Sequence, residues 1–105
     1  MGYYTEYSLE VNHKDELKII EQLRAENENT KYAFCNFGEA NDAIKWYDHE
    51  KDLREFSKKH STAIFTLKGN GEESGDIWVK YFKNGKMQAS RAKLVFDKFD
   101  KNLLK

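Results

Sequence analysis

The residue types best suited to chemistry are concentrated in one short segment, where Trp46, Tyr47, Asp48, His49 and Glu50 follow one another. A metal site needs ligands that converge, such as two histidines four residues apart on one face of a helix. Consecutive side chains point in different directions, and the two other histidines of the chain do not have this spacing to the segment. The segment therefore favours a helix cap at its aspartate over a metal site. We treat its five residues as candidates for binding a protein partner.

The second polar cluster is a glycine-rich segment at residues 69–75, followed by Asp76. It matches neither a phosphate-binding loop nor a dinucleotide fingerprint, and Glu72, Glu73 and Asp76 would repel a phosphate. Paired carboxylates can do acid–base chemistry when buried, but in a flexible loop they are usually solvated. Cys35 lies in an apolar segment without an adjacent base, which favours a small core residue over a nucleophile. We therefore expect no enzyme and no cofactor, and we count the three carboxylates among the partner-binding candidates.

The composition bounds the class of protein. A chain of 105 residues fits one domain, and a single cysteine cannot form an intrachain disulfide. Without a secretory signal or an apolar run of about 18 residues, the expectation is a cytoplasmic protein without a membrane span. The net charge is zero, but residues 1–57 hold 13 acidic and 7 basic residues, whereas residues 77–105 hold 8 basic and 2 acidic ones. This bipolar charge indicates either ordinary solvated faces or a basic patch for an acidic partner.

Hydrophobic periodicity predicts the elements of the first two thirds of the chain. Alternation over residues 3–11 predicts a strand. A helix to about residue 27 should bury Leu17, Ile20 and Leu23, and a second helix should run from a cap at Asp48 to residue 59. Strand formers predict further strands at residues 31–37 and 63–67 and a shorter one at residues 43–46.

The most distinctive local signal is Asn84-Gly85, a two-residue type I′ turn that predicts a hairpin of residues 76–83 and 86–96. A two-residue turn fixes the register, so Phe82 should lie opposite Met87, Lys80 opposite Ala89, and Trp78 opposite Arg91. One face of the hairpin is more aliphatic, and we expect it to be the core: Ile77, Val79, Tyr81, Ala92, Leu94 and Phe96. The other face would then be open and would bind a partner: Trp78, Lys80, Phe82, Met87 and Arg91.

Together these elements predict an α+β fold, a mostly antiparallel sheet with two helices packed on one face. A ferredoxin-like arrangement with an added C-terminal hairpin is one instance. If the open hairpin face exposes its aromatics, pairing two copies would hide them, so a homodimer is expected.

Four segments, at residues 45–50, 65–67, 71–78 and 80–88, give the chain a resemblance to small proteins of phages, prophages and their bacterial hosts. The resemblance covers about the last sixty residues and implies no catalytic residue. It implies a non-enzymatic module that binds a host protein, as anti-defence (anti-CRISPR-like) inhibitors do. The alternative is a nucleic-acid-binding protein, because cations interleave with aromatics along the hairpin.

Overall fold

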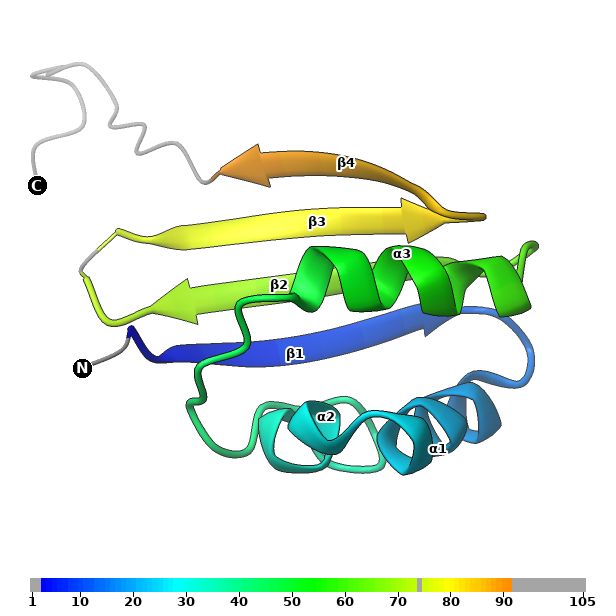
Figure 1. Cartoon of the computed structure of the whole chain (residues 1–105), viewed down its shortest axis with the longest axis horizontal. Helices are drawn as coiled ribbons and strands as arrows, with labels where there is room; N and C mark the ends of the chain where they lie inside the picture. Colours follow the sequence, from blue (N-terminus) through cyan, green and yellow to red (C-terminus); the bar gives the residue numbers. More distant parts are fainter. Residues whose placement is uncertain (1–2, 74, 92–105) are drawn as a thin grey trace, which may run out of the picture.

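The fold, taken from a computed structural model that describes residues 3–73 and 75–91, is α+β, as predicted. A four-stranded sheet has the order β1-β2-β3-β4, each strand antiparallel to its neighbour, and the helices lie on one side of it (Figure 1). In chain order the elements are β1 (Thr5–Asn12), α1 (Glu16–Glu26), α2 (Glu28–Ala33), α3 (His49–Lys59), β2 (Ile64–Gly71), β3 (Ile77–Lys83) and β4 (Lys86–Arg91).

Strand β1 follows its sequence pattern. Tyr7, Leu9 and Val11 are buried under the helices, and the residues between them face away. The strand pairs with β2, far along the chain, with Leu9 opposite Leu67 and Val11 opposite Phe65. The prediction of this strand is confirmed.

Helix α1 buries Ile20 and Leu23 as predicted, but Leu17 is exposed. The buried stripe consists of Ile19, Ile20 and Leu23, and at 100° per residue Leu17 lies roughly 110° away from its centre. The prediction for Leu17 was wrong because the buried stripe of α1 is narrower than the spacing of the helix's apolar residues suggested, and Leu17 falls outside it.

The strand predicted at residues 31–37 is wrong. Asn27 ends α1 and caps α2, because its side chain accepts a hydrogen bond from the Asn29 backbone N–H at 3.0 Å. This local cap outweighs the strand propensity of the aromatic residues that follow. Residues 43–46 form one β-bridge, between Ile44 and Thr5, rather than a strand. Without a strand between the helices there is no ferredoxin-like crossover, and the sheet is built in sequential order.

Helix α3 begins and ends as predicted and crosses over β2 and β3 (Figure 1), although the Asp48 side chain makes no capping hydrogen bond. Strand β2 extends beyond the predicted residue 67, so that Gly69 and Gly71 are paired in the sheet and not in a loop. A Cβ atom at Gly69 would lie 2.1 Å from the Trp78 ring. The glycine therefore makes room for the indole opposite it.

The hairpin has the predicted turn and register. Asn84 and Gly85 have φ values of 48° and 81°, as a type I′ turn requires, and the three predicted residue pairs lie opposite each other.

The predicted faces of the hairpin are inverted. Phe82 and Trp78 are 0% and 8% exposed, whereas Ile77 and Tyr81 are 46% and 40% exposed. The pairing with β2 determines this, since Phe82 lies opposite Phe65 and Trp78 opposite Gly69, all on the side of α3. Of the other residues predicted for the core, Val79 is only half-buried, and Ala92, Leu94 and Phe96 lie outside the described residues.

Candidate protein-binding site

Three segments that are far apart in the sequence meet where β1 begins, β3 begins and α3 begins (Figure 1). They line a pocket of about 230 Å³. Its lining residues are Tyr3, Thr5, Tyr7, Trp46, Tyr47, His49, Asp76, Trp78 and Lys80. The bridge between Thr5 and Ile44, with two backbone hydrogen bonds of 3.0 Å, holds the segment before α3 against β1. The sequence-predicted segments 46–50 and 72–76 are therefore brought together.

The floor of the pocket is aromatic and belongs to the core. Tyr7 packs edge-on against Trp46 and Trp78, with ring centroids 5.3 and 5.9 Å apart. The Tyr7 hydroxyl donates to the Trp46 carbonyl at 3.3 Å, and burial raises the pKa of this phenol. Both tryptophans, which the sequence predicted as partner-binding residues, are buried and present no exposed ring; their contact with solvent is through the pocket that they line.

Lys80 lies along one wall of the pocket, and its ammonium group is held by three groups of the same chain. It is 2.6 Å from His49 Nε2, 2.9 Å from a Glu50 carboxylate oxygen and 4.3 Å from the centre of the Trp78 ring. The ammonium lowers the pKa of the Glu50 carboxyl through their hydrogen bond. Since its polar contacts are made within the chain, Lys80 is not poised to receive a phosphate.

His49 is a neutral imidazole in this arrangement. Its Nδ1 donates to the Trp46 carbonyl at 2.8 Å, which leaves Nε2 to accept from Lys80. The ring stacks on Trp78 with an interplanar angle of 16°, and burial lowers its pKa, with the nearby ammonium acting in the same direction. His49 therefore serves as a fixed structural link.

Three lining residues and three neighbours joined to them through the backbone or hydrogen bonds form a set that we call the tyrosine rim: Tyr3, Tyr47 and Asp76 of the pocket, with Tyr4, Glu72 and Glu73 beside them. The Tyr3 hydroxyl donates to Asp76 at 2.6 Å, which raises the pKa of Tyr3, and it accepts from the Glu73 backbone N–H at 3.0 Å. The Tyr47 hydroxyl accepts from the Tyr3 backbone N–H at 3.3 Å. These contacts fix the tyrosines in place, although the Tyr47 side chain is 69% exposed.

The Tyr4 backbone joins the rim to the acidic loop by donating to a Glu72 carboxylate oxygen at 2.7 Å. The Tyr4 ring is exposed, and the ammonium group of Lys45 lies over it in a cation–π contact, 5.0 Å from the ring centre. Sequence reasoning placed Tyr3 in a strand and did not identify either tyrosine as a site residue. The signal that would have found them is the pairing of β1 with β2, which brings the start of the chain beside residues 71–76.

The remaining predicted site residues lie elsewhere. Phe82 is buried in the core and Met87 packs against it, at the other end of the sheet, so the predicted open hairpin face does not exist as a binding surface. Arg91 lies opposite Trp78 as predicted.

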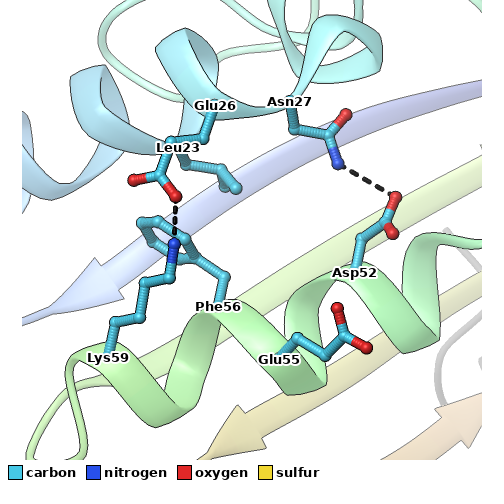
Figure 2. Close-up of a pocket in the computed structure, with 7 residues that line it drawn as sticks. All are labelled: Leu23, Glu26, Asn27, Asp52, Glu55, Phe56 and Lys59. Atoms are coloured by element: carbon cyan, nitrogen blue, oxygen red, sulfur yellow. Dashed lines mark hydrogen bonds and ion pairs between the residues drawn. The ribbon is translucent and has the colours of Figure 1, made fainter.

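A second pocket, also of about 230 Å³, lies between α1 and α3 (Figure 2). Ion pairing of Lys59 with Glu26 lowers the pKa of the glutamate, and the Asn27 amide donates to Asp52 at 2.9 Å. The same Asp52 oxygen accepts from the Trp46 indole N–H at 2.7 Å. The polar groups of this pocket therefore bond to one another and to Trp46. Because these bonds join α1 to α3 and α3 to the indole, we assign the pocket a structural role.

Within residues 3–73 and 75–91 there is no group of three potential metal ligands. No helix in this part of the chain is long and apolar enough to cross a bilayer. The chain matches no protein-family model, and neither the curated proteins nor the solved structures contain a significant match to it.

Proposed function

We propose that this chain is a non-enzymatic protein-binding module that grips its partner with the tyrosine rim. The observation that carries the proposal is the convergence of three remote segments, which presents Tyr47 to solvent and fixes Tyr3 by hydrogen bonds to the acidic loop. Tyrosines held in this way offer a large contact area at a low cost in conformational entropy. Interface hot spots are enriched in such residues.

The chemistry of the rim suggests a partner with a basic surface. Glu72 and Glu73 are exposed at the rim, and Asp48 is exposed at the nearby start of α3. Carboxylates beside tyrosines suit arginine in particular, since a guanidinium can bind a carboxylate through two hydrogen bonds and stack on an aromatic ring.

The resemblance to small phage and prophage proteins supports a bacterial host protein as the partner and inhibition of that protein as the outcome. Small phage proteins without enzymatic motifs often act by blocking host machinery, including defence nucleases. This inference concerns the class of partner and identifies no individual target.

The test is co-purification from a bacterial lysate followed by mass spectrometry, with wild-type protein and two variants of the rim. Tyr47→Ala and the double variant Glu72→Lys/Glu73→Lys should lose a stoichiometric partner that wild type retains. Tyr32→Ala is the matched control, because this tyrosine is also exposed but lies on α2 outside the pocket. Recovery of no partner together with turnover of a small metabolite, or a partner retained by both rim variants, would overturn the proposal.

The alternative function, nucleic-acid binding, loses most of the observations that supported it. Trp78 and Phe82, the rings proposed to stack on bases, are buried, and Lys80 is held by His49 and Glu50. Gel shifts with short single- and double-stranded oligonucleotides at low and moderate salt test this alternative. We expect at most weak, salt-sensitive binding, and a sub-micromolar shift at physiological salt would restore it.

A further inference from the structure

The side of the sheet that faces away from the helices is a second surface, which we call the open face. No helix of the described residues covers it (Figure 1). Three of its four outward side chains on β3 are apolar, with Ile77 and Tyr81 exposed and Val79 half-buried. Ile64 of β2 is also half-buried. Isolated exposed apolar residues are ordinary, but here they share the two central strands of one face.

Two hollows meet at one end of this apolar row, where they share Ile64 and Tyr81. One, of about 670 Å³, extends past Glu10 to the exposed ring of Phe37. The other, of about 330 Å³, extends over the start of the hairpin past Lys83 and Lys86. The row of apolar side chains therefore runs along β3 and ends at Tyr81 between two shallow depressions.

The charge of the open face changes sign from one edge of the sheet to the other. On β1 the outward residues include Glu6 and Glu10, and across the hairpin turn they are Lys83 and Lys86, all exposed. Glu10 also lies 3.5 Å from Lys68. That pair is exposed at both side chains and is worth at most about 1 kcal/mol, so Glu10 remains available.

We propose that two copies of this chain pack their open faces together about a two-fold axis parallel to the strands. Such a rotation places β1 of each copy over β4 of the other, because these strands are the opposite edges of the sheet (Figure 1). Glu10 of one copy then lies one row from Lys83 and Lys86 of the other, within reach of their long side chains, whereas Glu6 is three rows away and takes no part in this contact. Tyr81 of each copy lies near the axis, over Thr66 of the other. A two-fold axis perpendicular to the strands would instead place acid over acid.

A second copy fits this face better than a partner of one charge. A basic or an acidic partner would meet like charges along one edge, whereas the same face rotated by the two-fold axis meets opposite charges along both. The footprint of four strands and about seven residues is on the order of 450 Å². Two such footprints bury about 900 Å² in total, below the roughly 1,200 Å² at which stable interfaces begin, so the dimer should be weak and dissociate on dilution.

The inference goes beyond the proposed partner binding, because the pocket with Tyr3, Tyr47 and Asp76 of the rim lies on the helix side of the sheet and is left free. It also differs from the homodimer expected from the sequence, which used the opposite face of the hairpin. That face is buried in the core.

Sedimentation velocity over a range of concentrations tests the proposal with the full-length chain and two charge reversals, Glu10→Lys and Lys83→Glu. We expect wild type to dimerise reversibly and each variant alone to be monomeric at concentrations where wild type is dimeric. An equimolar mixture of the two variants should form a heterodimer. Position 10 of each chain then again has the opposite charge to position 83 of its partner. Glu21→Lys, an exposed reversal on α1, is the matched control and should leave the dimer unchanged.

Two results would overturn the proposal. The first is a wild-type chain that remains monomeric at the highest concentration reached, which would leave the open face to solvent, to another part of the chain or to a different partner. The second is a dimer that neither reversal weakens, which would place the contact on another surface. Circular dichroism of each variant establishes that a loss of dimer is not a loss of fold.

Discussion

The adjacent residues Tyr81 and Phe82 allow a direct test of which face of the hairpin forms the core. Phe82 is fully buried, opposite Phe65 on β2 and Met87 on β4, whereas Tyr81 points to the open face and is 40% exposed. Replacing each in turn by alanine therefore compares two aromatic truncations that differ in the side of the sheet. Phe82→Ala should be far more destabilising.

The magnitude follows from burial. Phe82→Ala removes a whole ring from a closed environment and should lower the free energy of unfolding by about 3–5 kcal/mol. This is a large part of the total of about 5–15 kcal/mol that a domain possesses. Tyr81→Ala loses strand propensity and a partly solvated contact, which together cost about 1 kcal/mol.

Urea unfolding followed by circular dichroism measures both values. With a slope of about 2 kcal/mol per molar urea, Phe82→Ala should lower the midpoint by about 2 M and Tyr81→Ala by about 0.5 M, with similar slopes. The measurement belongs at low protein concentration, because a dimer through the open face would add a concentration-dependent contribution at Tyr81. If Phe82→Ala does not fold, Phe82→Leu gives the same comparison at a smaller cost.

The reasoning is refuted if Tyr81→Ala is the more destabilising of the two substitutions. That result would restore the original prediction, in which the aliphatic face of the hairpin is the core. It would also remove the packing argument that links the buried indole of Trp78 to the glycine opposite it.

Three further predictions concern the connections around the pocket. Asp52→Ala should cost about 1–3 kcal/mol in thermal or urea unfolding, because the buried indole N–H of Trp46 loses its acceptor. Gly69→Ala should destabilise strongly and shift tryptophan fluorescence, since the new methyl group would overlap the Trp78 ring, with a closest approach of 2.1 Å. Burial lowers the pKa of His49 from its usual 6.5, so the unfolded imidazole takes up a proton at a higher pH than the folded one. The free energy of unfolding should therefore fall as the pH drops through and below about 6.5, and His49→Gln should reduce this fall in urea titrations at pH 7.5 and 5.5.

The sequence predicted the hairpin in detail but not its orientation. Asn84-Gly85 determines the turn and therefore the register, because both positions need positive φ. The alternation of side chains along a strand defines the two faces of the hairpin but does not determine which face is buried. That choice depends on the neighbouring strand, and the absence of a side chain at Gly69 is what admits the indole of Trp78 under α3.

The candidate site was predicted only in part, for a similar reason. Local density of polar and aromatic residues was enough to single out residues 46–50 and 72–76, and these do meet. Tyr3 completes the site through a hydrogen bond to a residue 73 positions away. No local pattern contains that contact, since it arises from the pairing of the first strand with one beyond three helices.

The two proposed surfaces lie on opposite sides of the sheet, and the burial pattern explains why they are independent. Phe82, Trp78 and Tyr7 point toward the helices, and Trp78 and Tyr7 build the floor of the pocket, so that the helix side presents the rim around that floor to a partner. The alternate residues, among them Tyr81, form the open face. A dimer through the open face would direct its two tyrosine rims away from each other, and each chain would still bind its own partner. Loss of one interaction should therefore leave the other measurable, and the two proposals can fail separately.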